Sequence, residues 1–222
     1  MNPSILMIIG SPRLRTSNSY SIAHYIKQGL KKLGWNTDLM FAHKAFSSDE
    51  IMHELIQKTQ NASIIGIIFP LYVDAVPGPL VNVLTQLCEH HRQENTEQKV
   101  FAIVNQGFPE PHQSNLALEI IDQFTKEYHA MYLGGYGIGA GGVIGGMPIE
   151  QIKHRSKQLV KALDLTIQSL HQQQSLSNQA EQLLSKPIFS KSLYLTFGNM
   201  AWKKQANKHG VKNLYQKPDK QI

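Results

Sequence analysis

The sequence predicts a doubly wound α/β domain built on five parallel strands. Five short apolar segments alternate along the chain with segments of helical periodicity, as in βαβ units. Several of the short segments are apolar on both faces, which is typical of strands buried inside a parallel sheet. We expect right-handed crossovers and the strand order 2-1-3-4-5, in which ligands bind at the carboxyl ends of strands one and three.

The individual elements follow from the apolar pattern. Strands are predicted at residues 5–9, 36–41, 62–69, 99–105 and 130–133. Helices are predicted at residues 18–33, 49–60, 79–94, 113–128 and 148–173. The stripe of the first helix comprises Ala23, Ile26, Leu30 and Leu33, and that of the fourth comprises Leu116, Leu118, Ile120, Ile121 and Phe124. The long last helix should bury Ile152, Leu159, Leu163, Ile167 and Leu170.

Length, cysteine content and charge exclude several classes of protein. A chain of 222 residues suffices for one domain with a full core and an appendage. The single cysteine, Cys88, excludes an internal disulfide framework and an all-cysteine iron–sulfur cluster. No segment reads as a signal peptide, and no apolar run approaches the roughly 20 residues of a membrane span, so we expect a cytoplasmic protein.

The net charge of +6 is concentrated at the C-terminal end. Residues 186–222 contain eight lysines and one acidic residue, whereas residues 1–185 have a net charge of −1. The basic character therefore belongs to the tail and does not indicate a nucleic-acid-binding domain. No nucleic-acid partner is expected.

The loop at residues 10–19 has the composition of an anion site. It lies between the first strand and the first helix, whose N-terminus offers unpaired N–H groups and the positive end of the helix dipole. Arg13 and Arg15 add positive charge with a geometry suited to phosphate. Further donors are Ser11, Thr16, Ser17, Asn18 and Ser19. We expect this loop to hold the terminal phosphate of a cofactor.

Two further loops should meet the phosphate loop at the same edge of the sheet. Residues 70–79 contain three prolines and one glycine, which predicts a stiff loop after the third strand. Residues 106–111 follow the fourth strand. The segment 134–146 has eight glycines in thirteen residues, which fits either a tightly folded loop or close approach of the backbone to a ligand. No metal site is expected, because His90 and His91 do not share a helix face.

The loop motifs resemble those of a known family. Gly-Ser-Pro-Arg followed by Ser-Asn-Ser, within residues 10–19, is similar to the phosphate loop of flavodoxin-like NAD(P)H-dependent FMN reductases. Pro-Leu-Tyr at 70–72 with Pro-Gly-Pro at 77–79 resembles the second flavin loop of that family. The resemblance covers about residues 4–170 and implies that FMN is the cofactor and that NADPH or NADH is the co-substrate.

The resemblance also implies roles for particular residues. The FMN phosphate would be bound by Ser11, Arg13, Ser17, Asn18 and Ser19. The isoalloxazine ring would be lined by Pro70, Leu71, Tyr72 and Val73, and its pyrimidine side would be approached by Asn105, Gln106 and Gly107. Hydride would pass from NAD(P)H to FMN and on to a quinone, a flavin or another small acceptor. Because the cofactor carries this chemistry, no general acid or base is assigned. As a separate expectation, we predict a homodimer.

Two other functions remain open at this point. A flavodoxin-type electron carrier would bind the same cofactor without turning over on its own. The two arginines of the phosphate loop favour the reductase, since phosphate loops of electron carriers are usually rich in threonine and glycine. The third alternative is an interaction protein that has lost flavin and acts through its basic tail.

The tail defines a second part of the chain. We expect residues 1–174 to form the FMN-binding domain and residues 175–222 to form a basic helical extension, with aromatic residues among its lysines. The favoured interpretation is an arm that packs on the domain or on a partner subunit. The alternatives are attraction of the NADPH phosphates, peripheral contact with an anionic membrane, and binding of nucleic acid.

Overall fold

The computed structural model describes residues 3–91, 97–152, 156–185, 191–211 and 214 of the chain. It divides into two compact units, Met1–Ile188 and Phe189–Ile222, which are described separately. The first unit contains the sheet, and the second contains one long helix.

A five-stranded parallel sheet forms the centre of the first unit. Its order is β2-β1-β3-β4-β5, which confirms the predicted doubly wound fold. In register, Ile5 of β1 lies beside Ile64 of β3, and Ile64 lies beside Lys99 of β4. The strands are β1 (Ser4–Ile9), β2 (Asn36–Phe41), β3 (Ile64–Pro70), β4 (Lys99–Asn105) and β5 (Met131–Ile138).

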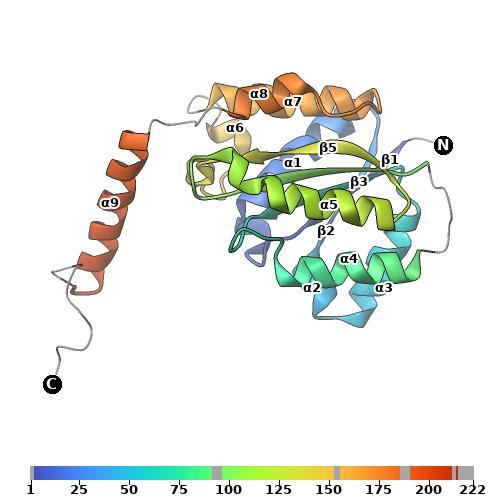
Figure 1. Cartoon of the computed structure of the whole chain (residues 1–222), viewed down its shortest axis with the longest axis horizontal. Coiled ribbons are helices and arrows are strands. Elements are labelled where there is room, and N and C mark those ends of the chain that lie inside the picture. The colour runs from blue at the N-terminus through green and yellow to red at the C-terminus, as the bar shows by residue number, and fades with distance from the viewer. Residues whose placement is uncertain (1–2, 92–96, 153–155, 186–190, 212–213, 215–222) are drawn as a thin grey trace. The chain divides into compact units, whose positions relative to one another are not determined.

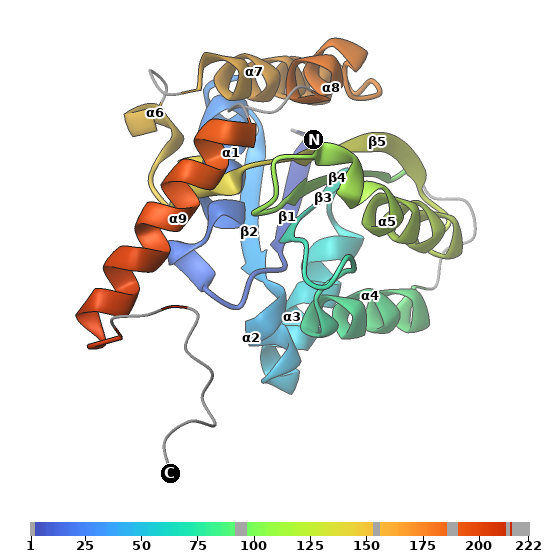
Figure 2. The same ribbon diagram turned by 60° about the vertical axis from the view of Figure 1, so that its left-hand side comes forward.

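Helices cover both faces of this sheet (Figures 1 and 2). Side chains alternate along β1, so that Met7 faces one layer of helices and Ile8 faces the other. The first layer comprises α1 (Asn18–Lys32), α6 (Ile149–Ile152), α7 (Lys157–His171) and α8 (Asn178–Ser185). The second layer comprises α2 (Ala42–Phe46), α3 (Asp49–Gln60), α4 (Gly78–His90) and α5 (Asn115–Glu127).

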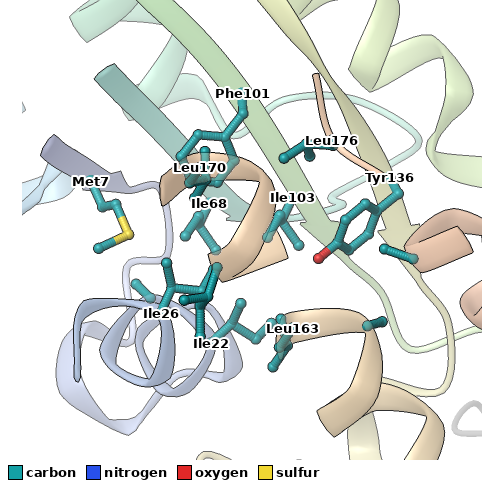
Figure 3. Close-up of a cluster of buried hydrophobic side chains, with 14 of the residues drawn as sticks. Met7, Ile22, Ile26, Ile68, Phe101, Ile103, Tyr136, Leu163, Leu170 and Leu176 are labelled. Atoms are coloured by element: carbon teal, nitrogen blue, oxygen red, sulfur yellow. The ribbon is translucent and has the colours of Figure 1, made fainter. Parts of the chain in front are cut away.

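The core beneath α1 and α7 fixes the position of α1 against the sheet. Figure 3 shows Ile22 and Ile26 of α1 among side chains of the sheet and of α7. The one polar group drawn there, the Tyr136 hydroxyl, lies 2.6 Å from the hydroxyl of Thr166, and burial raises its pKa. The apolar side chains of α1, packed between the sheet and α7, hold this helix against the sheet.

Several elements differ from their expected bounds. The helix expected at 148–173 consists of α6 and α7, and α7 begins at its own N-cap, Ser156, whose hydroxyl accepts from the Leu159 N–H group. Strand β5 extends to Ile138, well beyond the expected end at residue 133. It continues through Gly135 and Gly137 because β4 pairs with it along that length. Helix α2 was not expected.

The buried stripes of two helices also need correction. Leu33 is exposed, because α1 ends at Lys32 and Leu33 is its C-cap. In α5, Leu116 and Ile120 are exposed, and the buried residues are instead Ala117, Ile121, Phe124 and Thr125. Thr125 can be buried because its hydroxyl donates to the carbonyl of Ile121. The five residues expected to be buried at 152–170 are all buried, as predicted.

The first unit extends beyond the expected boundary at residue 174. Leu176, Ala180 and Leu184 are buried in the same core cluster as α1 and α7. The Leu176 N–H group also donates to the carbonyl of Leu133 in β5, at 2.7 Å. Residues 175–185 therefore belong structurally to the sheet domain and not to the extension, since they cover apolar surface at its edge.

The second unit contains α9 (Lys191–Lys208). Leu195, Met200 and Trp202 of this helix are exposed. None of the helices in the described part of the chain combines the length and the apolar character that crossing a bilayer requires. How the extension packs stays a prediction.

Candidate cofactor-binding site

Four loops at the carboxyl edge of the sheet line one open pocket. Its cavity volume is about 190 Å³. The loops follow β1, β3, β4 and β5, so the pocket lies where the doubly wound order places ligands. The lining residues are Ser11, Arg13, Ser17, Asn18, Pro70, Leu71, Tyr72, Asn105, Gln106, Gly107, Gly141 and Gly142.

The first loop begins with a tight turn at Gly10. A Cβ atom there would lie 2.6 Å from the Cβ of Phe69 and 2.7 Å from a methyl group of Leu80, so only glycine fits without displacing its neighbours. The Gly10 N–H group donates to the carbonyl of Ile68 at 2.9 Å. Leu14 then has φ of 49°, a left-handed conformation that is uncommon for a leucine. The turn brings the loop back over the N-terminus of α1.

Helix α1 begins beside the pocket and has unpaired N–H groups in its first turn. Ser17 is its N-cap, and the Ser17 hydroxyl accepts from the Tyr20 N–H group at 3.1 Å and donates to the carbonyl of Leu14 at 2.6 Å. The N–H groups of Asn18 and Ser19 have no acceptor among the described residues. They are the groups that a bound anion would satisfy. Ser17 lines the pocket, but its hydroxyl proton is committed to the helix cap.

Ser11 and Arg13 provide the other donors of this loop. Ser11 is buried, and its oxygen accepts a long hydrogen bond of 3.4 Å from the Arg13 N–H group, which leaves the hydroxyl proton without an acceptor in the described structure. The guanidinium group of Arg13 is exposed and forms no ion pair with any described residue. Arg15 is also exposed but does not line the pocket. The charge of Arg13 is therefore available to a ligand.

The loop after β3 forms a tight hairpin with a two-residue turn. Tyr72 and Ala75 exchange two backbone hydrogen bonds of 3.1 Å, and Val73 and Asp74 between them have φ of 50° and 56°. Two left-handed residues at a hairpin tip are the geometry of a type I′ turn, which rarely contains a β-branched residue. The Val73 side chain is 98% exposed and does not line the pocket, whereas Tyr72 does.

Asn105, at the end of β4, connects three loops of the site. Its buried amide nitrogen donates to the Ser19 hydroxyl at 2.7 Å and to the carbonyl of Phe69 at 2.9 Å. The backbone carbonyl of Asn105 accepts from the Leu71 N–H group at 2.9 Å. Ser19 is fully buried in this contact and does not line the pocket, so its hydroxyl supports the loop and does not face the cavity.

The side chain of Gln106 forms hydrogen bonds with residues of its own loop and of the short helix that follows. Its amide nitrogen donates to the carbonyl of Glu110, and its amide oxygen accepts from the Ser114 hydroxyl at 2.8 Å. Both polar atoms of the Gln106 side chain therefore already have partners in the described structure. Gly107 follows, and a Cβ atom there would meet nothing within 4 Å.

The glycine-rich segment supplies a wall that the sequence did not assign. Gly141 and Gly142 line the pocket, and Gly141 donates to the carbonyl of Gln106 at 2.7 Å. Other glycines of the segment approach backbone: a Cβ atom would lie 2.7 Å from the carbonyl oxygen of Pro111 at Gly137, and 2.4 Å from that of Pro109 at Gly139. The run of glycines was the available signal for this close packing.

The structure thus brings ten of the twelve predicted site residues to one pocket, with Ser19 and Val73 outside it. Arg13 is the charged residue of the lining, which makes the end of the pocket near α1 positive. No group of three metal-ligating side chains occurs within the ranges that the structure describes.

Comparison with known proteins agrees with this geometry. Residues 3–142 match the model of the family described as NADPH-dependent FMN reductase. The chain belongs to this family. Membership confirms the predicted resemblance and with it an FMN-dependent, NAD(P)H-using oxidoreductase. No curated protein matches the sequence significantly.

Solved structures show the same fold. An apo NADH:FMN oxidoreductase (EMOB) superposes with a TM-score of 0.60 at 17% identity, over 81% of this chain and 94% of the other. An FMN-dependent NADH-azoreductase from Bacillus anthracis with FMN bound superposes with a TM-score of 0.54 at 12% identity, over 77% of this chain and 100% of the other. General stress protein 14 from Treponema denticola with FMN bound also has a TM-score of 0.54 at 12% identity, over 73% of this chain and 98% of the other.

Proposed function

We propose that this reductase binds FMN in the pocket at the carboxyl edge of the sheet and passes hydride from NAD(P)H through it to a small acceptor, such as a quinone or a free flavin. The observation that carries this proposal is the combination of an anion-binding end with a loop that bears Tyr72, in one pocket. A phosphate with a planar ring attached is the chemistry that such a pair of walls fits.

The residues near α1 fit the phosphate group. The N–H groups of Asn18 and Ser19 lack acceptors in the described structure, and the Ser11 hydroxyl has a proton to donate. Arg13 adds a charge-assisted contact. Ser17 contributes by fixing the helix start, since its own hydroxyl is bonded to Leu14 and Tyr20.

The residues of the other loops fit the ring. Pro70, Leu71 and Tyr72 provide apolar and aromatic surface, and Asn105 with Gly107 provides the polar edge. Bound flavin supplies the hydride-transfer chemistry. The chain's contribution is to hold the phosphate, orient the ring through loops that are bonded to each other, and exclude water from one of its faces. No side chain is required to move a proton.

Titration of the purified protein with FMN tests the proposal. Binding should quench flavin fluorescence and shift its visible absorbance, and steady-state oxidation of NADPH or NADH should follow when a quinone is added. Absence of binding at micromolar FMN would refute the cofactor assignment. An electron carrier would bind FMN but would turn over negligibly without a separate reductase, so the second measurement distinguishes the two functions.

We also propose that the protein is a cytoplasmic homodimer whose extension packs on the sheet domain or on the partner subunit. The exposed apolar side chains of α9 support the packing of the extension, because packing would bury them. Sedimentation equilibrium tests the dimer. Trp35 is buried, so the difference in emission between the wild type and Trp202→Phe reports the surroundings of Trp202. Blue-shifted Trp202 emission in buffer supports packing, whereas a shift that requires anionic vesicles supports membrane contact instead.

A further inference from the structure

The side chain of Asn18 bridges two loops that are far apart in the sequence. Its amide nitrogen donates to the carbonyl of Gly141 at 2.8 Å, and its amide oxygen accepts from the Gly146 N–H group at 2.8 Å. One carboxamide thereby fastens the glycine-rich loop after β5 to the start of α1. Both hydrogen bonds connect residues more than 120 positions apart, so they are tertiary contacts and not part of a local turn.

The two glycines that Asn18 contacts are sterically required for the bridge. A Cβ atom at Gly146, whose φ is 72°, would lie 2.3 Å from the carbonyl oxygen of Thr16. A Cβ atom at Gly141 would lie 3.0 Å from the carbonyl oxygen of Gln106 and 3.1 Å from the Asn18 amide nitrogen. The backbone of the loop therefore approaches the first loop so closely that no side chain fits at Gly146 without moving one of the two loops.

Helix α1 does not need this side chain for its own start. Ser17 provides the N-cap, and its hydroxyl meets the Tyr20 N–H group. The carboxamide of Asn18 is directed instead to the loop whose residues Gly141 and Gly142 form one wall of the pocket. Its backbone N–H group remains available to an anion, so one residue faces the ligand with its backbone and the loop with its side chain.

We infer that Asn18 is a positioning residue that couples phosphate binding to the order of the glycine-rich wall, a role that rests on the proposed FMN site. An anion on the Asn18 N–H group restrains this residue and hence the carboxamide that holds residues 141–146. By linkage, a loop that is already held makes the N-terminus of α1 a better anion site. The wall and the phosphate loop then behave as one binding unit.

Affinity measurements with matched variants test the coupling. Asn18→Ala removes both hydrogen bonds, and Gly146→Ala pushes the loop away from Thr16 although residue 146 does not line the pocket. Each should raise the Kd for FMN about tenfold. The double variant should be no weaker than the weaker single one, because both remove the same contact. Gly145→Ala is the control: it has φ of 58°, but its Cβ atom would meet nothing closer than 3.6 Å.

Hydrogen exchange of the Gly146 N–H group measures the bridge directly, because its rate in the free protein does not depend on the affinity for FMN. In the free protein, exchange of the Gly146 N–H group should be faster in Asn18→Ala than in the wild type, and unchanged in Arg13→Ala. Saturating FMN should slow this exchange in the wild type and not in Asn18→Ala. Additive effects of the two substitutions, or a Gly146→Ala variant that binds FMN like Gly145→Ala, would overturn the coupling. A wild type that fails to bind FMN would overturn the proposed function, whereas the exchange rates of the free protein would still report the bridge.

Discussion

Replacement of Arg13 by alanine should weaken the binding of FMN without lowering the stability of the fold. The guanidinium group forms no ion pair with any described residue, so its removal leaves no buried partner unsatisfied. A charge-assisted hydrogen bond to phosphate contributes about 1.5–3 kcal/mol, which corresponds to a roughly 10- to 150-fold rise in Kd. Because Arg13 is exposed and its field is screened by solvent, we expect a value near the lower limit, about tenfold.

The assay is titration of FMN by fluorescence quenching, at low salt and at about 1 M salt. If the side chain acts through charge, the difference between the wild type and Arg13→Ala narrows at high salt, where the Debye length falls to about 3 Å. The free energy of unfolding should change by less than about 0.5 kcal/mol. Arg15→Ala is the matched control, since Arg15 lies in the same loop but outside the pocket. Equal effects of the two substitutions, or none, would refute the assignment of Arg13.

Two further substitutions and one change of pH test the packing of the sheet domain. Asn105→Ala removes two buried hydrogen bonds and should lower the unfolding free energy by about 2–4 kcal/mol in urea denaturation. Gly137→Ala should cost about 1–3 kcal/mol in thermal denaturation, because its Cβ atom would lie 2.6 Å from the Ser114 hydroxyl oxygen, whereas Gly78→Ala, which meets nothing within 4 Å, should cost nothing. Burial raises the pKa of Tyr128 from 10.0 to about 12, so its contribution to stability should be lost as pH rises from about 10 to 12. Absorbance titration of the wild type and of Tyr128→Phe measures the pKa of this phenol, and urea denaturation of both proteins between about pH 9 and 12 measures the loss of stability.

The location of the site follows from sequence because it depends on strand order. Apolar segments such as residues 64–69 and 100–104 identify buried parallel strands, and the loops that follow such strands meet at one edge. Gly10 and Pro70 mark those loops by composition alone. The pocket was therefore predictable without knowledge of any side-chain contact.

The direction of individual side chains did not follow from sequence. Ser17, Asn18 and Ser19 are consecutive, but each helical residue is rotated by about 100° from the one before. As a result the first caps the helix, the second reaches the glycine-rich loop, and the third is buried against Asn105. The side chain of Gln106 donates to the carbonyl of Glu110 because the fold of its own loop brings that carbonyl within reach. Such choices are made by tertiary neighbours that periodicity does not encode.

The side chains that hold the loops together differ from the exposed side chains of the same loops. Asn18, Asn105 and the glycines fix the loops to one another, whereas Tyr72, Val73 and Phe108 are exposed. Substitutions at these exposed positions should therefore leave the hydrogen bonds between the loops intact. The surface of these loops can diverge in sequence at little cost in folding, because the stability of the site depends on other residues.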